Sequence, residues 1–367
     1  MNNVHGLIYA YHMHPDLGDL CKRRTAAALP FCAHFRLIDF AMFGMMNAGV
    51  PDVDVVMQYG FQSLMDHLTS GRLWNLVRHS GGMHLLLAPV NRGAYGGAMD
   101  ALDSIYPRLR DDVKRDYILL TRGDLCANID MRALIEAHYA SGADITAVCT
   151  TQPIYGLHQS FLPDGNGFAS DLLCRQTTPG RGLCSLETYI LRREKLLEMI
   201  RWCGESNRLH FHRDGLLHMM GNGWRVGLFM HSGYARFITS IQDYYSASME
   251  MLDPIKRAQL FPEERRVATR ARSDVSTYYG DAARVHDSLV ADGCIVEGRV
   301  ERCILFNGVR VGPDCSLRDC IIMNNTEIGA HTDLSSVVAD KDVTVSANLH
   351  LCGSARLPLV IPKGSCL

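Results

Sequence analysis

Apolar runs alternate with amphipathic stretches in the first part of the chain. Val4–Ala10 and Tyr117–Leu120 are short, mainly apolar runs, and Val53–Met57 is rich in β-branched residues, which is typical of buried parallel strands. Met131–Tyr139 is amphipathic with helical spacing, and Ile145–Cys149 follows it as another strand. This strand–helix–strand order predicts an α/β domain with a mixed, mainly parallel sheet and helices on both faces.

From about residue 285 onward, the hydrophobic pattern changes to a short repeat. Three motifs with an aliphatic residue followed by a small one recur every 17 residues: Val311–Asp314, Ile328–His331 and Val345–Asn348. Apolar pairs lie between them at spacings of 17 and then 16 residues: Ile304-Leu305, Ile321-Ile322 and Val337-Val338. About three coils of three short strands each are visible, which predicts a parallel β-helix built on hexapeptides. An antiparallel sandwich with coincidental spacing is the alternative.

The length of 367 residues favours two domains rather than one. We predict that residues 1–248 form the α/β domain and that residues 285–367 form the β-helix. Residues 249–284 have mixed charge, two prolines and weak periodicity, so they are interpreted as the interdomain connection. Within the first domain, residues 152–182 are polar and rich in proline and glycine, which indicates loops and short strands.

The composition excludes several classes of protein. With 37 basic and 39 acidic residues, the formal net charge is −2, so a nucleic-acid-binding surface is not expected. The sequence has no apolar run of the roughly 18–20 residues that a membrane helix needs, and its start lacks the pattern of a secretory signal. Thirteen cysteines without CxxC spacing favour free thiols and a cytoplasmic location. Four of them are expected to fill the β-helix core: Cys294, Cys303, Cys315 and Cys320.

Several segments resemble, in order, those of a known enzyme family. The stretches similar to the family segment FRLIDFxLSNxxNSGI are Phe35-Arg36-Leu37-Ile38-Asp39-Phe40 and Asn47-Ala48-Gly49-Val50. Further matches are Gln58-Tyr59 with QYxSxxL, Gly97 and Asp100 with RGTADA, Gly123-Asp124 with GDH, and Leu209–Leu217 with HDFxxDIIP. On these residues the chain is identified as a member of the glucose-1-phosphate adenylyltransferase (ADP-glucose pyrophosphorylase) family. The resemblance implies a Rossmann-like (GT-A-like) nucleotidyltransferase domain followed by a left-handed parallel β-helix of hexapeptide repeats.

The resemblance also implies which groups act in the active members of the family. A glycine-rich loop and its arginine hold the ATP phosphates, a lysine of an RAKP segment contacts phosphate, and a lysine of an EKP segment holds glucose 1-phosphate. Two aspartates, in the GDH and WRDVGT segments, bind Mg²⁺. Because a sugar phosphate attacks ATP, two anions meet, and cations must offset their repulsion in the transition state.

This sequence departs from the family pattern in the glycine-rich loop. Aligned without gaps, the loop begins at Tyr11 and His12, whose side chains would fill the space that glycines leave for a phosphate. Pro15 has no N–H to donate, and Asp16 reverses the charge of the family's arginine. A phosphate cradle is therefore not expected here.

The lysines and one metal ligand are also missing. The RAKP lysine falls on Ala26, the nearest counterpart of the EKP lysine is Thr178, and the second aspartate falls on Phe237. Only Asp124 remains of the metal pair, so we expect no cofactor and at most weak binding of Mg²⁺. The predicted vestigial pocket, with no intact catalytic residue, consists of Tyr11, His12, Asp16, Ala26, Gly97, Asp100, Asp124 and Phe237.

The pattern is similar to that of regulatory, GlgD-type members of the family. That resemblance implies a non-catalytic subunit in bacterial glycogen synthesis, which assembles with a catalytic ADP-glucose pyrophosphorylase subunit into a heterotetramer and modulates its allosteric response. Three alternatives stay open: a weakly active adenylyltransferase, a stand-alone sugar-nucleotide sensor and, less favoured, an acyltransferase of the hexapeptide type.

Basic residues near the FRLIDF-like segment are candidates for binding a phosphate or sugar-phosphate effector, because the family places effector-binding cations there. The candidates are Arg23, Arg24, His34 and Arg36. Two groups of histidines are interpreted as structural. His12 and His14 are expected to fill the lost loop, although alternate positions on a strand would let both reach one ligand. His210, His212 and His218 lack the spacing of a clear metal site.

Overall fold

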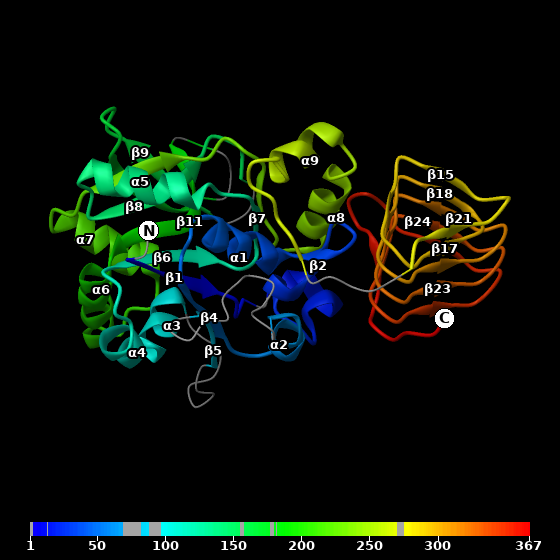
Figure 1. Cartoon of the computed structure of the whole chain (residues 1–367), viewed down its shortest axis with the longest axis horizontal. Coiled ribbons are helices and arrows are strands. Elements are labelled where there is room, and N and C mark those ends of the chain that lie inside the picture. Colours follow the sequence, from blue (N-terminus) through cyan, green and yellow to red (C-terminus); the bar gives the residue numbers. More distant parts are fainter. Residues whose placement is uncertain are drawn as a thin grey trace.

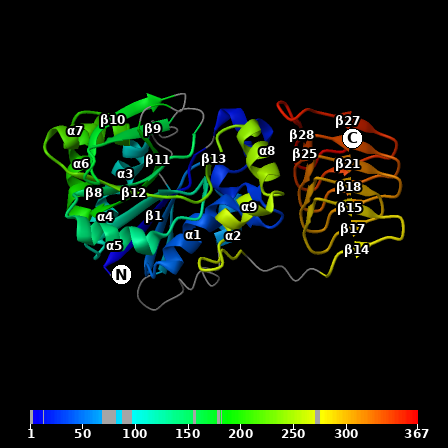
Figure 2. The same cartoon turned by 90° about the horizontal axis from the view of Figure 1, so that it is seen from above.

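The computed structural model describes residues 3–12, 14–68, 82–87, 97–154, 158–176, 180, 182–269 and 275–367. An N-terminal α/β domain and a C-terminal solenoid lie side by side, and two helices lie between them, α8 (Ile241–Glu250) and α9 (Pro254–Leu260) (Figures 1 and 2). No helix in these ranges is both long enough and apolar enough to span a membrane.

Nine strands of the described chain form the central sheet. They are β1 (Val4–Tyr9), β4 (Asp52–Met57), β5 (Gly82–Leu87), β6 (Tyr117–Arg122), β8 (Ile145–Thr150), β9 (His158–Pro163), β10 (Ala169–Gln176), β11 (Leu183–Arg192) and β12 (Val226–Met230). β1 pairs in parallel with β4 and β6, β4 with β5, and β8 with β12, whereas β11 is antiparallel to its neighbours β6, β8 and β9. The prediction of a mixed, mainly parallel sheet is therefore confirmed. The stretch predicted as loops and short strands contains the hairpin of β9 and β10.

Side-chain alternation divides the core into two halves, one on each face of the sheet. One core contains residues of α1 (Leu37–Asn47), α2 (Gln62–Leu68) and α5 (Met131–Ser141). The other contains residues of α3 (Ala98–Ser104), α4 (Tyr106–Asp111), α6 (Arg193–Glu205), the π-helical turn η4 (Phe211–Leu216) and α7 (Leu217–Gly221). On β1, Val4 and Ile8 face the first core while Leu7 faces the second. Helices thus cover both faces, as the sequence pattern predicts.

The family-like segment at residue 35 has a structural role at the start of α1. The Arg36 backbone N–H donates to the Asp39 carboxylate over 2.9 Å, and the other oxygen of Asp39 lies 2.6 Å from His67 Nε2 on α2. Asp39 therefore caps α1 and ties it to α2. Before this segment come the 3₁₀ turns η1 (Pro15–Cys21) and η2 (Ala26–Ala28) and the short hairpin of β2 (Pro30–Phe31) and β3 (Phe35–Arg36).

The C-terminal part is a parallel β-helix of five coils in the described residues. One sheet stacks β14 (Tyr278–Tyr279), β17 (Ile295–Val296), β20 (Arg310–Val311), β23 (Glu327–Ile328) and β26 (Thr344–Val345). The second stacks β15 (Arg284–His286), β18 (Arg299–Glu301), β21 (Ser316–Arg318), β24 (Asp333–Ser335) and β27 (His350–Cys352). The third stacks β16 (Leu289–Val290), β19 (Ile304–Leu305), β22 (Ile321–Ile322), β25 (Val337–Ala339) and β28 (Leu359–Ile361). The predicted β-helix with three strands per coil is confirmed.

The sequence pattern underestimates the number of coils, because only the middle coils keep the 17-residue period. Ile295 pairs with Arg310, 15 residues on, and Val338 pairs with Val360, 22 residues on. Strand register also places Val338 rather than Val337 opposite Ile321. The first coil strand begins at Tyr278, inside the stretch predicted as the interdomain connection.

Small residues, and residues in the left-handed backbone conformation, form the corners of the coils. A Cβ on Gly329 would lie 2.5 Å from the Ala347 backbone nitrogen of the next coil, so the small residue after the aliphatic one is needed for close stacking. Two residues further along each motif, Asp314, His331 and Asn348 have φ of 55°, 56° and 63°. Asp and Asn are the non-glycine residues best suited to that backbone region. All thirteen cysteines are free, and the four predicted core cysteines are buried.

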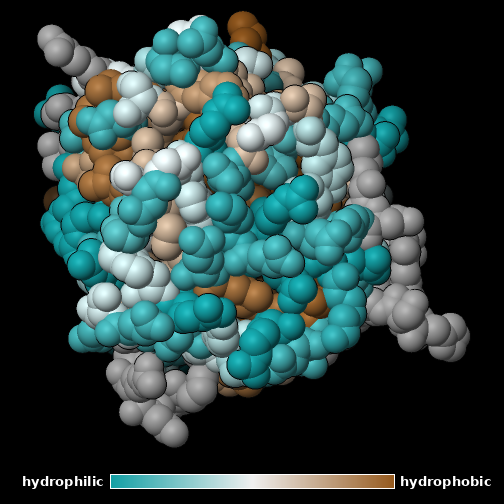
Figure 3. All heavy atoms as spheres, turned by 90° about the vertical axis from the view of Figure 1, so that its left-hand side faces the viewer, coloured by the Kyte–Doolittle hydropathy of each residue, from teal (hydrophilic) through white to brown (hydrophobic). Residues whose placement is uncertain are grey.

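A shared hydrophobic core joins the two domains. It contains Leu37 and Phe40 of α1, Tyr244 of α8, and Ile304 and Ile321 of the β-helix, among others. Hydrogen bonds and an ion pair cross the same junction: Tyr245 Oη donates to the Asp319 carbonyl over 2.8 Å, and Arg24 pairs with Asp340. The domains are therefore packed against each other. Seen from the opposite end, the α/β domain is mostly hydrophilic, with separate apolar areas at the upper left and below the centre of the view (Figure 3).

Candidate functional site

The loops after β1 and β6 meet at the carboxyl edge of the sheet. The two strands are parallel neighbours with Tyr9 opposite Arg122, and the Gly123 N–H donates to the Tyr9 carbonyl over 2.6 Å. Ligands of open α/β sheets bind at this edge. The loop after β1 and the Gly123-Asp124 turn, which the sequence assigned to one pocket, therefore lie together.

A group of charged side chains fills this edge. Arg122 binds both oxygens of Asp124, with Nε to Oδ1 and Nη2 to Oδ2 each at 2.8 Å, and its Nη1 donates to Glu187 Oε2 over 3.1 Å. His14 Nε2 lies 2.9 Å from Asp124 Oδ2, and His12 Nδ1 lies 3.8 Å from the same oxygen. We call Arg122, Asp124, His12, His14 and Glu187 the Arg122 cluster. It joins residues of three strands and loops around one guanidinium.

Electrostatics in the Arg122 cluster keep both acids ionised. Burial by itself would raise the pKa of Asp124, but the charge of Arg122 and the hydrogen bonds from Arg122 and His14 hold that pKa well below its usual value. Burial likewise opposes ionisation of Glu187, yet the charge of Arg122 lowers the pKa of this carboxyl as well. One arginine thus faces two carboxylates, and Asp124 is only 1% exposed.

The two histidines of the lost loop face the same carboxylate. Their rings are parallel, with an interplanar angle of 2° and centres 5.7 Å apart. Burial and the charge of Arg122 lower the pKa of His12 to about 4, so this ring is neutral at pH 7. The sequence predicts His12 and His14 as filler of a lost loop, with the alternative that both reach one ligand, and the structure brings both to Asp124.

Phe237 lies on the other side of the guanidinium. This residue belongs to β13 (Ala235–Phe237), which pairs with β7 (Leu125–Ala127) directly after Asp124. The Arg122 guanidinium carbon is 4.8 Å from the centre of the Phe237 ring, a cation–π contact. The arginine is therefore held between Asp124 and the residue at the second aspartate position.

A pocket of about 340 Å³ adjoins the Arg122 cluster. His12 and Glu187 lie on one side of it and Gly97 and His212 on another. His212 Nε2 is hydrogen-bonded to the Tyr189 hydroxyl. A Cβ on Gly97 would lie 2.1 Å from the Leu209 carbonyl oxygen, so only glycine allows this approach of α3 to the 209–212 segment.

The other predicted pocket residues are placed as follows. Tyr11 is buried against His12, with ring centres 4.5 Å apart, and the Ala26 N–H donates to the His12 carbonyl over 3.0 Å. Asp16 is exposed in η1, and Asp100 lies in the first turn of α3. Thr178 lies outside the described residues.

The predicted effector residues separate into different environments. Arg24 is buried and bonded to Asp340, Arg36 Nη1 donates to the backbone carbonyl and hydroxyl of Ser63, and Arg23 is exposed. His34 lines a separate pocket at the domain junction. The four candidates therefore do not form one site.

A lysine of the β-helix, Lys341, lies near Arg24 and Arg36. Burial and the charges of Arg36 and Arg24 lower the pKa of Lys341 to about 7, and Lys363 acts in the same direction. Asp340 is the acid that opposes them. The Nη1 atom of Arg24 is buried and has no hydrogen-bond partner among the described residues. We call Arg24, Arg36, Asp340, Lys341 and Lys363 the Lys341 cluster.

The three later histidines show no metal-binding geometry. His218 stacks on Trp202 with ring centres 3.6 Å apart, His212 bonds Tyr189, and His210 is exposed. Within the part of the chain that the structure describes, no group of three or more histidines, cysteines or acids is placed to hold a metal ion.

Known proteins resemble this chain in both of its parts. Residues 273–355 match the family of GlmU-like C-terminal hexapeptide domains. The glycogen biosynthesis protein GlgD of Bacillus subtilis (strain 168) is 30% identical to the chain, over 99% of this chain and 96% of GlgD. The glucose-1-phosphate adenylyltransferase of Thermomicrobium roseum is also 30% identical, over 96% of this chain and 84% of that protein. The chain belongs to the glucose-1-phosphate adenylyltransferase family. A third member, from Clostridium beijerinckii, is 27% identical over 87% of the chain and 84% of its own length.

The family's magnesium site does not fit the residues that this member carries. Phe237 offers no oxygen at the second aspartate position, and both oxygens of Asp124 accept hydrogen bonds from Arg122. Mg²⁺ prefers oxygen ligands in octahedral geometry. Because the guanidinium charge already lies where the metal ligand points, these residues do not support a reaction step through Mg²⁺.

The sequence analysis did not predict two central residues of the site, Arg122 and Glu187, although the position of Arg122 in the sequence offered a clue. Arg122 directly precedes the family-like Gly123-Asp124, and a cation at the end of an apolar strand needs a buried partner. Glu187 gave no comparable signal, because it lies on a distant strand. Its φ of 50° is unusual for a non-glycine residue and marks it only once the backbone is known.

Proposed function

We propose that this chain is a non-catalytic regulatory subunit of ADP-glucose pyrophosphorylase in bacterial glycogen synthesis. The observation that carries the proposal is the bidentate pairing of Arg122 with Asp124, with Phe237 on the other side of the guanidinium. The last acidic group of the family's metal pair is thereby engaged by an internal cation. The relationship to GlgD of Bacillus subtilis supports the link to glycogen synthesis.

Magnitudes favour this function over a weakly active enzyme. Loss of one preorganised charge-stabilising group typically costs about 100- to 1000-fold in rate. This chain lacks the phosphate-binding glycines, two lysines and one aspartate of the active members, and such losses reduce rate strongly even though they are not additive. Interfaces and effector sites depend on surfaces other than the active site, so their function does not require the missing groups.

The direct test is an assay of the purified chain with ATP, glucose 1-phosphate and Mg²⁺, followed by the same assay with the catalytic subunit added. We expect no pyrophosphate release by the chain alone and a changed rate or effector response of the mixed enzyme. The control is Asp124→Asn, since true catalysis at this site would depend on that carboxylate. Pyrophosphate release that Asp124→Asn abolishes would establish the weakly active enzyme instead.

The same proposal includes a phosphate or sugar-phosphate effector at the domain junction. The Lys341 cluster supports it, because the basic residues Arg24, Arg36 and Lys341 lie near one another there and Arg24 Nη1 is buried without a hydrogen-bond partner among the described residues. We expect Arg36→Ala to weaken activation of the mixed enzyme by sugar phosphates. Lys22→Ala is the matched control, because Lys22 is an exposed cation of the nearby basic run and pairs with Asp19. An unchanged activation curve for Arg36→Ala would rule out this site.

Tight binding of a sugar nucleotide without any catalytic partner would instead indicate a stand-alone sensor. Co-purification with the catalytic subunit separates the two functions, because a sensor has no need to form a stable mixed assembly.

A further inference from the structure

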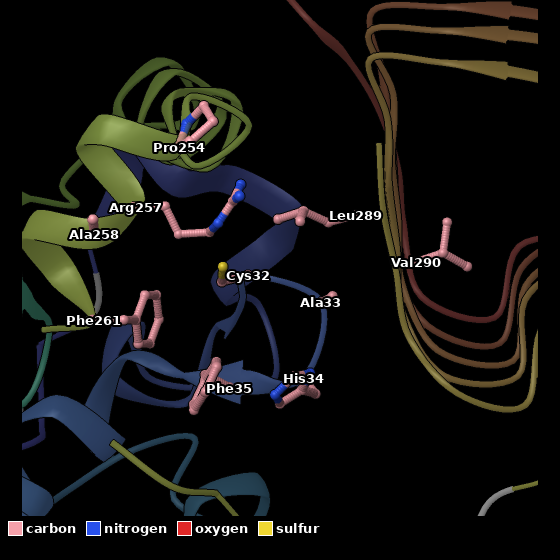
Figure 4. Close-up of a pocket in the computed structure, with 10 residues that line it drawn as sticks. All are labelled: Cys32, Ala33, His34, Phe35, Pro254, Arg257, Ala258, Phe261, Leu289 and Val290. Atoms are coloured by element: carbon pink, nitrogen blue, oxygen red, sulfur yellow. The ribbon is translucent and has the colours of Figure 1, made fainter. Parts of the chain in front are cut away.

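The cysteines that line cavities in this fold are poor nucleophiles. Cys32 lies on the wall of a pocket of about 580 Å³ between the two domains (Figure 4), and burial raises the pKa of its thiol to about 12. Burial also raises the pKa of Cys174, which lines the pocket beside the Arg122 cluster. Because the thiolate is the reactive form, neither side chain is expected to be modified. An asparagine followed by glycine, in contrast, reacts without any ionised group.

The sequence contains three asparagines that are followed by glycine: Asn166, Asn222 and Asn307. At such a pair, the backbone nitrogen of the glycine can attack the carbonyl carbon of the asparagine side chain, since glycine has no side chain to obstruct the approach. The attack needs an asparagine side chain that is free to turn. It also needs a glycine N–H that no hydrogen bond holds in place.

Both conditions are met at the tip of the hairpin of β9 and β10, which lies in the half of the α/β domain farther from the β-helix (Figures 1 and 2). Asn166 and Gly167 are exposed there. Asp164 Oδ1 accepts the N–H groups of Asn166 and Phe168, over 2.7 and 3.1 Å, but not the N–H between them. Among the described residues, neither the Gly167 N–H nor the Asn166 side chain has a hydrogen-bond partner.

Asn222 is also exposed, but both of the groups that would react are held. The Gly223 N–H donates to the Met220 carbonyl over 3.0 Å. Asn222 Nδ2 lies 2.8 Å from His218 Nε2, so the side chain is fixed as well. Exposure therefore does not distinguish this pair from Asn166–Gly167, whereas hydrogen bonding does.

Asn307 lies inside the β-helix and is 6% exposed. Its Nδ2 and the N–H of Gly308 both donate to the backbone carbonyl of Asp292 in the preceding coil, each over 3.3 Å. Attack at this pair would break both bonds in a stacked coil. We therefore expect Asn307 to be the slowest of the three to react.

We propose that Asn166–Gly167 is a site of spontaneous deamidation that forms isoaspartate. The Gly167 nitrogen bonds to the side-chain carbonyl carbon of Asn166, the bond from that carbon to Nδ2 breaks, and Nδ2 leaves as ammonia with the proton of the glycine N–H. Water then opens the cyclic imide at either of its carbonyl carbons, which gives aspartate or isoaspartate. Water is the only co-reactant. The inference goes beyond the proposed regulatory function and does not depend on it.

The modification would change the contact between the hairpin and β12. The Gly167 carbonyl accepts the Leu228 N–H over 2.9 Å, and Phe168 pairs with Gly227 as an antiparallel bridge. The guanidinium carbon of Arg225 lies 3.9 Å from the centre of the Phe168 ring. Isoaspartate adds a methylene to the backbone directly before Gly167, so this register cannot be kept. Hydrogen exchange at the Leu228 N–H should therefore become faster as the protein ages.

The test incubates the purified full chain at mildly alkaline pH and follows the three peptides by mass spectrometry. Isoaspartate is quantified with an isoaspartate-specific carboxyl methyltransferase and S-adenosylmethionine as methyl donor. One hydrogen bond changes such a rate by about 2- to 10-fold, so with two bonds absent we expect Asn166 to react roughly tenfold faster than Asn222. Equal rates at the three sites, or earlier loss of ammonia at Asn222, would overturn the proposal.

Urea separates the effect of the structure from that of the sequence. In the unfolded chain all three glycine N–H groups meet solvent, so the three rates should converge. A preference for Asn166 that persists unchanged in urea would refute the structural argument.

A pair of variants locates the reaction. Asn166→Gln, whose longer side chain forms a cyclic imide far more slowly, should remove most of the methyltransferase signal and the faster exchange at Leu228. Asn222→Gln, the matched control, should leave both unchanged. Thermal melting verifies that each variant folds. A full signal from Asn166→Gln would place the isoaspartate elsewhere and contradict the proposal.

Discussion

Two buried arginine–aspartate pairs of this protein share the same chemistry and differ in what surrounds them. Arg122 binds Asp124 two residues away, within one domain, and a second acid, Glu187, shares the guanidinium. Arg24 binds Asp340 across the domain junction, and the basic residues Arg36 and Lys341 lie near the pair. A second acid therefore lies beside the first pair, whereas further basic residues lie beside the second pair.

The arginine–aspartate ion pair therefore has a different role in each of the two clusters. In the Arg122 cluster, the arginine supplies the positive charge that two carboxylates would otherwise draw from solution. In the Lys341 cluster, the aspartate joins the β-helix to the α/β domain, and the neighbouring residues Arg36 and Lys341 are basic. The first arrangement places two acids around one arginine, whereas the second places several basic residues around one acid.

The largest expected effect is at the domain junction. Arg24→Ala leaves Asp340 buried without its arginine, and breaking a buried pair in this way typically costs about 3–5 kcal/mol of unfolding free energy. Chemical denaturation followed by circular dichroism measures the loss. The double variant Arg24→Met/Asp340→Leu should recover most of it, because neither buried charge remains. Wild-type stability of Arg24→Ala would show that the pair does not hold the domains together.

A smaller effect with a different signature is expected in the Arg122 cluster. Arg122→Ala leaves two carboxylates with only histidines beside them, at a cost of about 2–3 kcal/mol. Here Mg²⁺ should raise the melting temperature of the variant, because carboxylate oxygens become available to it. Mg²⁺ should not raise that of Arg24→Ala, where cations surround the acid. KCl at equal ionic strength is the control, and equal rescue of both variants would refute the comparison.

The pH dependence of the unfolding free energy should reflect the Arg122 cluster through the titration of His12. The folded protein keeps this ring neutral down to pH about 4, whereas an unfolded histidine takes up a proton near pH 6.5. Stability is therefore lost as the pH falls between these values, by up to about 1.4 kcal/mol per unit. In Arg122→Gln, the pKa of His12 should rise, because a repelling charge is gone. Ring NMR titration measures it, and Arg24→Gln should leave it unchanged.

The smallest expected effect concerns the Phe237 ring beneath Arg122. Phe237→Leu removes the cation–π contact, which contributes about 0.5–1 kcal/mol beyond the packing of the ring. Phe229→Leu is the matched control, because Phe229 packs partly buried against the same core. Equal losses of unfolding free energy in the two variants would show that the ring contributes packing alone.

Much of the fold could be predicted because its signals are local or periodic. Buried strands such as residues 117–120 form short apolar runs, and stacked coils require an aliphatic residue followed by a small one at a fixed interval. The outer coils were not predicted because the spacing of their strands differs from that interval. Their strands are defined by backbone pairing with the neighbouring coil, which no spacing reveals.

The candidate site was predicted only in part, for the same reason. The sequence alone determined which family groups are missing, because each loss is a residue at an aligned position. It did not determine what replaced them.

Only the tertiary structure decided that Arg122 turns back onto Asp124, that Glu187 reaches it from a distant strand, and that Asp340 of the β-helix meets Arg24. Charges act through space, and a buried charge takes the partner that the fold brings within hydrogen-bonding distance. That partner can lie hundreds of residues away, where no local pattern records it.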